Sequence, residues 1–401
     1  MKTMIWGLAG AAMIAGAAFA QDTTTDIQQY DNGGIYEGEF RDGVQHGTGT
    51  YRLPNGYTYT GAWVDGEIRG QGTATFPDQS VYVGAFVAGR PQGTGTITFA
   101  DGSTYEGEWV EGRIEGTGTA TYSNGVAYTG TFRNALHHGS GVMTGPNGYR
   151  YDGEWVDGRK QGTGTITYPD GATYAGQFAA GVRSGTGRLE MADGVIYEGE
   201  WAEGQINGTG TLTQPNGDVY VGALVNGQRQ GQGQVTYANG DVYQGAFLND
   251  RRHGQGTFTG VDGYIYVGAW LEGRIEGEGR VTYPDGSVYT GTFRNDLAHG
   301  TGTITYPDSS SYTGEWVDGV IQGTGTATYA NGLVYEGQFL NARQHGQGTI
   351  SHPDGYSYTG GWEEGLRHGQ GRAVYADGTI YEGAFVAGQR DGEGTQTMPD
   401  G

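Results

Sequence analysis

Two short stretches in every 23-residue segment of the chain alternate large or glycine residues with polar residues. In one segment, Tyr105 to Trp109 reads Tyr, Glu, Gly, Glu, Trp, and Gly116 to Tyr122 alternates in the same way. A period of two places alternate side chains on opposite faces of a strand, so both stretches predict β-strands. A helical period of 3.6 is absent, and glycines at this spacing oppose a helix. We therefore expect an all-β fold.

The segment recurs sixteen times without an insertion or a deletion. Each repeat opens with a tyrosine, from Tyr36 to Tyr381, which we number position 0; positions 2, 11 and 13 are always glycine. Such self-similarity indicates units stacked against copies of themselves, because one unit is too small to bury its own apolar face. The sequence predicts a repeat array of antiparallel β-hairpins that forms an elongated single-layer meander sheet.

The connections between strands carry two kinds of turn chemistry. Successive repeats are joined by residues such as Tyr168-Pro169-Asp170-Gly171, with Asp or Asn at position 19 of every repeat. These residues predict a type I turn closed by a left-handed glycine. Gln79 and Ser309 replace that glycine in two repeats. Within a repeat, Val110 to Glu115 is rich in glycine and charge and predicts a looser loop.

Side-chain alternation also sorts the two faces of the predicted sheet. Tyr, Gly and Trp or Phe of the first strand share one face with two glycines, an aliphatic residue and often a tyrosine of the second strand, whereas Glu, Ala and Thr lie on the other. A single sheet without helices must cover its apolar face with its own rings over neighbouring glycines, or with a partner. We expect a bulky residue at Gly116 or Gly118 to displace the ring packed above it.

Position 4 alternates Phe and Trp, so the true period of that position is 46 residues. The alternation slips by one repeat at Leu224. Duplication of two-repeat blocks, with Leu224 at the junction of two halves, accounts for this pattern.

The consensus of these repeats resembles that of a known family. Tyr105-Glu-Gly107-Glu-Trp109-Val-Glu-Gly112-Arg-Ile-Glu-Gly116-Thr-Gly118 is similar to the MORN repeat, with its Tyr-x-Gly-x-Trp/Phe, Gly and Gly-x-Gly pattern. The resemblance covers Tyr36 to Gly401. It implies a single-layer sheet of hairpins curved into a groove. It also implies a binding and scaffolding module, as found at membranes, junctions and cytoskeletal structures, and no catalysis.

The N-terminus carries a different pattern, typical of a secretory signal peptide over residues 1–20. Lys2 precedes an uncharged apolar run that ends in small residues, and we expect cleavage between Ala20 and Gln21. We therefore expect an exported protein. The periplasm or cell envelope of a Gram-negative bacterium is the expected compartment, with the extracellular space as the alternative.

The remaining chain divides into a leader and the array. Residues 21–35 predict a short leader and a partial repeat that supplies a cap strand, and residues 36–401 hold the sixteen repeats. The last expected strand, about Gly392 to Met398, presents unpaired backbone groups. A second copy of the chain could pair with this edge, giving a homodimer.

The net charge and the lack of cysteine limit the classes of partner and of chemistry that we expect. The formal net charge is −22 and the chain has no cysteine. Such a surface repels phosphate backbones and anionic headgroups, which excludes nucleic acid as the expected partner and disfavours membrane lipid. Without cysteine the chain has neither disulfides nor a thiol nucleophile.

Two rows of side chains could suggest a metal site. Position 10 carries six histidines: His46, His138, His253, His299, His345 and His368. A carboxylate row comprises Asp42, Asp65, Glu111, Asp157, Glu203, Glu272 and Asp318. Neighbouring repeats are about 10 Å apart, whereas zinc–nitrogen bonds measure about 2 Å. We interpret the histidines as loop residues and the carboxylates as a solvated edge, with weak calcium binding as the alternative.

No arrangement of residues predicts catalysis. The recurrent Gly-Thr-Gly is a strand element without the following helix that a phosphate loop needs, and no serine sits in a strand-turn-helix elbow. We expect no enzyme, no cofactor and no metal.

The aromatic face is the candidate binding surface, because exposed apolar stripes mark interaction sites and Tyr and Trp dominate binding energies. We expect a non-enzymatic exported scaffold that binds a protein partner there. A membrane-lipid-associated protein, an end-to-end structural polymer, and rings that serve only as core remain as alternatives. The candidate residues are Tyr105, Trp109, Tyr128, Phe132, Tyr151, Trp155, Trp201, Trp270, Trp316 and Trp362.

Overall fold

The computed structural model describes residues 23–400, which form two compact units that divide between Pro169 and Asp170. The predicted signal peptide, with cleavage between Ala20 and Gln21, lies outside the described residues. Within residues 23–400 no helix is long and apolar enough to cross a membrane. Strands and the turns between them make up this part of the chain.

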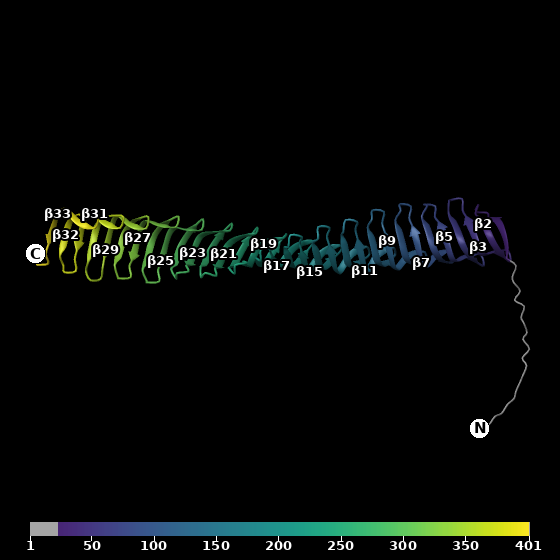
Figure 1. The fold of residues 1–401 in the computed structure, drawn as a ribbon, viewed down its shortest axis with the longest axis horizontal. Coiled ribbons are helices and arrows are strands. Elements are labelled where there is room, and N and C mark those ends of the chain that lie inside the picture. Colours follow the sequence, from purple (N-terminus) through teal and green to yellow (C-terminus); the bar gives the residue numbers. More distant parts are fainter. Residues whose placement is uncertain (1–22, 401) are drawn as a thin grey trace, which may run out of the picture. The chain divides into compact units, whose positions relative to one another are not determined.

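In the first unit, each strand pairs antiparallel with the next one in the chain, from β1 to β13. Figure 1 shows these strands side by side, from purple to teal. The strands are β1 Thr24–Gln29, β2 Ile35–Arg41, β3 Val44–Arg52, β4 Thr58–Val64, β5 Glu67–Thr75, β6 Val81–Val87, β7 Arg90–Thr98, β8 Thr104–Val110, β9 Arg113–Thr121, β10 Ala127–Arg133, β11 Leu136–Thr144, β12 Arg150–Val156 and β13 Arg159–Thr167.

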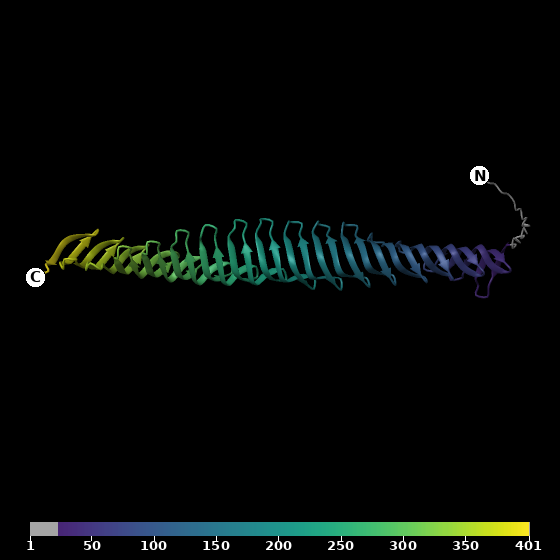
Figure 2. The same cartoon turned by 90° about the horizontal axis from the view of Figure 1, so that it is seen from below.

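The second unit has the same meander, from β14 to β33. Its strands form one layer in the turned view of Figure 2. They are β14 Thr173–Ala179, β15 Val182–Glu190, β16 Ile196–Ala202, β17 Gln205–Thr213, β18 Val219–Val225, β19 Gln228–Thr236, β20 Val242–Leu248, β21 Arg251–Thr259, β22 Ile265–Leu271, β23 Arg274–Thr282, β24 Val288–Arg294, β25 Leu297–Thr305, β26 Ser311–Val317, β27 Val320–Thr328, β28 Val334–Leu340, β29 Arg343–Ser351, β30 Ser357–Glu363, β31 Leu366–Val374, β32 Ile380–Val386 and β33 Gln389–Thr397. The predicted all-β antiparallel meander is confirmed.

The connection within a repeat is tighter than predicted. Strand β8 ends at Val110 and β9 begins at Arg113, so only Glu111 and Gly112 connect them. Both residues have positive φ, 48° and 80°, as a two-residue type I′ turn requires. The predicted looser loop over 110–115 is therefore wrong. Pairing with the neighbouring strand holds even Glu or Ala in the left-handed region at position 6, where the sequence shows no strong turn signal.

The connection between repeats follows the predicted turn chemistry. Gly125 has φ 82° and its N–H donates to the Tyr122 carbonyl at 2.8 Å. The Val126 N–H donates to the Asn124 side chain at 3.0 Å, which explains the Asp or Asn at position 19. Gln79 and Ser309 hold the same left-handed conformation, with φ of 71° and 68°.

Replacing Gln79 and Ser309 with glycine is expected to stabilise the protein, because a left-handed conformation costs a residue with a Cβ about 1 kcal/mol each. The double variant should raise the melting temperature in calorimetry. The matched control, Gly125→Ser, places the same strain in another turn and should lower it. A double variant that melts at or below the temperature of the unchanged protein would contradict this interpretation.

A β-bulge interrupts the hairpin of each repeat on the face opposite the rings. The register of β8 and β9 shifts between Gly107 and Trp109, and Gly116 has φ 72°. The Glu108 carboxylate accepts hydrogen bonds from the Thr117 hydroxyl and N–H, and these bonds lower the pKa of Glu108. A side chain at Gly116 would meet this carboxylate. The predicted clash of Gly116 with a ring is thus wrong.

The core consists of rings that lie over glycines, as predicted for Gly118. A Cβ built on Gly118 would stand 2.5 Å from the Tyr105 ring, which is 1% exposed. The Tyr105 hydroxyl donates to the Glu108 carbonyl at 3.0 Å, so its polar end is satisfied inside. Tyr105 contacts Trp109 and Phe132 edge to face, with centroids 5.7 and 5.0 Å apart. Repetition of these contacts builds an aromatic ladder along the sheet of each unit.

Leu224, where the Phe/Trp alternation slips, lies in the second unit and is 1% exposed. It pairs with Gly208 of β17 and Arg229 of β19, in the register of position 4 elsewhere. The aromatic ladder therefore lacks one ring at Leu224, while strand pairing continues through it.

Candidate functional site

The ten candidate aromatic residues are all buried, with exposed fractions from 0% to 7%. The expectation that these rings themselves form an exposed stripe is wrong, because each one is covered by neighbouring rings, glycines and a side chain at position 9. The indole nitrogens are satisfied internally as well: Trp109 donates to the Gly95 carbonyl at 3.1 Å, and Trp201 to that of Gly187 at 3.2 Å. These rings form the floor of the aromatic face.

Replacing Trp155 with leucine is expected to lower the free energy of unfolding by about 2 kcal/mol, because it removes contacts with the Tyr128 and Tyr151 rings and the internal hydrogen bond to the Gly141 carbonyl. Thermal unfolding should show the loss. Partner capture, measured well below the melting temperature, should stay unchanged. If capture falls while the melting temperature holds, Trp155 contacts the partner directly and the assignment to the core fails.

Three pockets lie on the aromatic face, above this floor. The pocket in the first unit has a volume of about 630 Å³ and is lined by Phe76, Pro91, Phe99, Trp109 and Ile114, among others. Two pockets in the second unit have volumes of about 650 and 530 Å³ and include Trp316 and Trp362, respectively. Turn residues from both ends of the hairpins line all three, so each pocket lies between two rims.

One rim carries exposed aromatic side chains at position 17. Phe99, Tyr122, Tyr306 and Tyr329 are between 37% and 39% exposed, and all but Tyr122 line one of the pockets. The sequence places the frequent tyrosine at position 17 on the same face as the rings, but this row was not included among the candidate binding residues. The available signal was composition, since a turn does not need the Phe or Tyr found at this position in most repeats.

The opposite side of the pockets is formed by position 9, which sequence reasoning also missed. Aliphatic residues occupy it in several repeats, as at Ile114 and Ile321. In others the residue is basic, and its charged group lies over a floor ring. The basic residues are His137, Lys160, Arg183, Arg229, Arg252, Arg367 and Arg390.

The basic side chains at position 9 have identifiable partners. The Arg183 guanidinium lies 4.1 Å from the centre of the Trp201 ring. His137 is stacked on Tyr128, with centroids 3.8 Å apart, and burial lowers the pKa of this histidine. Lys160 binds the Tyr149 hydroxyl and lies 4.9 Å from the Tyr151 ring; burial lowers the pKa of this ammonium.

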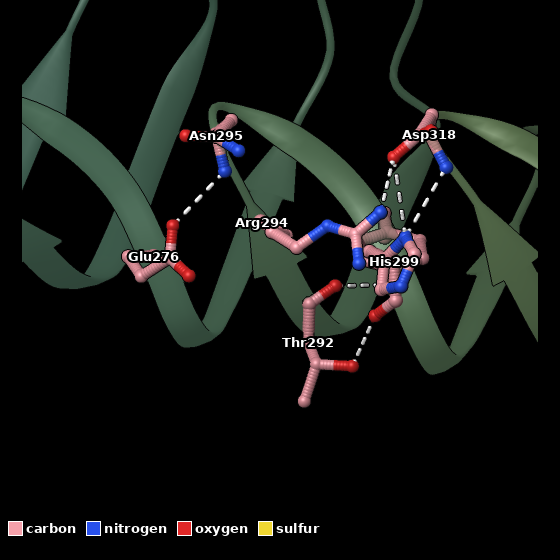
Figure 3. A network of polar contacts seen from close by, with 7 residues as sticks. Glu276, Thr292, Arg294, Asn295, His299 and Asp318 are labelled. Carbon is pink, nitrogen blue, oxygen red and sulfur yellow. Dashed lines mark hydrogen bonds and ion pairs between the residues drawn. The ribbon is translucent and has the colours of Figure 1, made fainter.

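Two position-10 histidines, His46 and His299, each accept a backbone N–H from the turn of the next repeat. In Figure 3 the Asp318 N–H donates to His299 Nδ1 at 3.4 Å, and Arg294 binds the Asp318 carboxylate at 2.9 Å, which lowers the pKa of that carboxylate. Glu276 accepts the Asn295 N–H at 3.0 Å in the same way. Residues 23–400 contain no group of three or more His, Cys, Asp or Glu that could hold a metal ion. These side chains satisfy the backbone of the turns.

Comparison with protein families gives a match along the array. The model of the MORN repeat matches residues 36–56, 59–81, 82–104, 105–126, 128–148, 151–173, 174–196, 197–219, 220–242, 243–263, 266–288, 289–311, 312–334, 335–355, 358–380 and 381–401. No curated protein sequence gives a significant match.

Several solved structures are similar in part. The TCP10 domain of CPAP from Danio rerio is 15% identical, covering 53% of this chain and 95% of that one, with a TM-score of 0.29. The SAS-4 TCP domain of Drosophila melanogaster, in complex with a proline-rich motif of Ana2, is 13% identical, with coverages of 55% and 99% and a TM-score of 0.25. Virginiamycin B lyase from Staphylococcus aureus is 9% identical, with coverages of 77% and 93% and a TM-score of 0.12. At these TM-scores the likenesses carry no argument about function.

Proposed function

The chain belongs to the MORN-repeat family, and from this premise we propose that it is a non-catalytic scaffold that binds a protein partner on its aromatic face. The observation that carries the proposal is the set of pockets above the buried rings, bordered by exposed Phe and Tyr side chains at position 17. Aromatic residues are enriched at the centres of protein interfaces. The rigid floor lets these side chains bind without reorganising the sheet.

The proposal is tested by removing aromatic side chains that solvent reaches on the rim. The double variant Tyr306→Ala, Tyr329→Ala should melt at a lower temperature, because each side chain is more than half buried. It should stay folded at the assay temperature and lose most of its partner capture from native extract. The control is Val221→Ala, Val267→Ala, which removes side chains of 54% and 47% exposure on the opposite face. The control should capture normally. Equal capture by both double variants would rule out the aromatic face as the binding surface.

We further propose that the protein works outside the cytoplasm, in the periplasm or cell envelope. The support is the pattern of the first 20 residues, and N-terminal sequencing of the exported protein should begin at Gln21. Lipid association and end-to-end assembly remain alternative readings. Flotation with liposomes at physiological salt would favour the first, and a mass that rises with concentration the second.

A further inference from the structure

We propose that the aromatic face of the second unit binds an extended, acidic segment of the partner, whose carboxylates are held by Arg183, Arg252 and Arg367. This inference rests on the proposed function and specifies the chemistry of the partner. It begins with the three guanidinium groups, which occupy position 9 in three repeats.

Each of the three arginines is half-buried against the floor. The Arg252 guanidinium lies 4.0 Å from the centre of the Trp270 ring, and that of Arg367 lies 5.0 Å from Phe385. Each also donates a hydrogen bond to the carbonyl of a loop glycine, as Arg252 does to Gly273 at 2.9 Å. Arg367 donates a second one to the Tyr356 hydroxyl at 3.2 Å. Stacking and the bond to the glycine carbonyl fix the plane of the group. A guanidinium has five N–H donors, so others remain for a ligand.

These arginines carry no carboxylate partner within the described chain, although the protein is strongly acidic. Arg229, at the same position, forms an ion pair with Asp250 at 3.3 Å and is therefore excluded from the proposed site. On the opposite face, Arg188 and Arg372 bind Glu190 and Glu382 at 2.9 Å. Among the acidic residues of 23–400, none forms an ion pair with Arg183, Arg252 or Arg367.

The side chain at position 9 does not need a charge to cover the floor rings. Ile275 and Ile321 occupy position 9 in other repeats, and the position-4 rings of the following repeats, Phe293 and Phe339, are buried there beside a neutral side chain. The positive charge thus serves a purpose other than packing. A fixed, stacked guanidinium with free donors matches a carboxylate, which it can bind through two parallel hydrogen bonds.

The order of residues along position 9 defines the shape of the occupant. From Arg252 to Arg367 the row reads Arg, Ile, Ala, Ile, Gln, Arg, and it crosses the pockets that contain Trp316 and Trp362. Five repeats separate these two arginines, which corresponds to roughly 50 Å and to about 15 residues of extended chain. Arg183 lies three repeats before Arg252, so only a longer segment, of about 24 residues, reaches all three. The row therefore fits a segment with an apolar middle and acidic ends.

The acidic rims of the aromatic face favour binding of a single peptide chain over binding of an anionic membrane surface. The turns on both sides carry carboxylates, such as Asp285 and Asp308 on one side and Asp318 on the other. A bilayer would meet these carboxylates before it reached the arginines, whereas a peptide can lie between the rims. The arginines can attract carboxylates of the segment despite the negative net charge of the protein, because at physiological ionic strength salt screens charges that lie more than about 8 Å apart.

The experiment selects binders for the full chain from a displayed library of random peptides of about 16 residues. Repulsion by a net charge of −22 alone would deplete Asp and Glu among the binders. The proposal predicts the reverse, an enrichment of Asp and Glu. The best binder should then lose about tenfold in affinity with either Arg252→Ile or Arg367→Ile, measured by fluorescence anisotropy.

Two controls separate binding from packing. Arg252→Ile keeps the ring covered, as Ile275 does, so its melting temperature should hold. Arg251→Gln removes the same charge one residue away, where Arg251 forms an exposed ion pair with Glu272, and should bind normally. Lower stability of Arg252→Ile with unchanged affinity would overturn the proposal.

The remaining outcomes distinguish this inference from the proposed function. Binders without acidic enrichment that compete with the native partner would overturn the inference and leave the proposed function standing. Arginine-dependent binding of phosphatidylglycerol vesicles, with no peptide binder, would also overturn it. If no peptide binds at all, the inference fails, and partner capture by the Tyr306 and Tyr329 variant decides the proposed function.

Discussion

Replacing Gly118 with valine is expected to destabilise the protein by about 3 to 5 kcal/mol, because the Tyr105 ring must leave its place in the core. The ring lies where the new Cβ would stand, and the Tyr105 hydroxyl would lose its bond to the Glu108 carbonyl. Repeats in such arrays are stabilised by their neighbours, so the damage should spread to adjacent repeats. Thermal unfolding should show a lower and broader transition.

The neighbouring residue provides the matched control for this substitution. Thr119 is exposed on the opposite face of β9, where no ring lies. Thr119→Val places the same valine side chain there and exchanges only a hydroxyl, hydrogen-bonded to that of Thr129 at 3.1 Å, for a methyl group. Its melting temperature should stay within a degree or two of the unchanged protein, since exposed substitutions rarely exceed about 0.5 kcal/mol. Equal melting temperatures for Gly118→Val and Thr119→Val would show that the ring does not occupy the space above the glycine.

The protein is expected to unfold cooperatively at alkaline pH, as its tyrosine ladder ionises. Burial raises the pKa of Tyr59, Tyr82, Tyr105 and Tyr289 to about 12, whereas an exposed tyrosine ionises near 10. The folded state favours the neutral phenol. Its contribution to stability is complete below pH 10 and is lost as the pH rises through about 12. Many tyrosines share this environment, so the effect should be large.

The tyrosinate absorbance and the far-ultraviolet circular dichroism should therefore change together, above pH 10. The same protein in guanidinium chloride is the control and should titrate near pH 10. A folded protein whose tyrosines ionise near pH 10 with unchanged circular dichroism would contradict a buried ladder.

The repeat period is sufficient to predict the strands and their order from the sequence alone. Alternation from Tyr105 to Trp109 gave the faces correctly, and the glycine at position 13 indicated where a ring would lie. Gly116 was misread because position 11 is glycine for another reason: the bulge requires a positive φ there, on the face of Glu108. The sequence alone does not distinguish a glycine that leaves space for a packed ring from a glycine that is needed for its positive φ.

The candidate site was harder to predict than the fold. Large aromatic residues are typical of binding surfaces and of cores. The structure shows that Trp109 and Trp201 are buried beneath other side chains. The covering side chains come from position 9 of a neighbouring strand, as with Arg183 over Trp201. Such a contact between repeats follows from the register and twist of the sheet, which the order of residues within one repeat does not reveal.

Photo-crosslinking in the native host shows which face of the sheet contacts the partner. A benzophenone amino acid would replace Tyr306 or Ile321, which line a pocket, or Val221 or Val267, which are exposed on the opposite face. We expect one protein adduct from Tyr306 and Ile321 and none from the two valines. An adduct formed from Val221 or Val267, with none from the pocket positions, would show that the partner binds the other face.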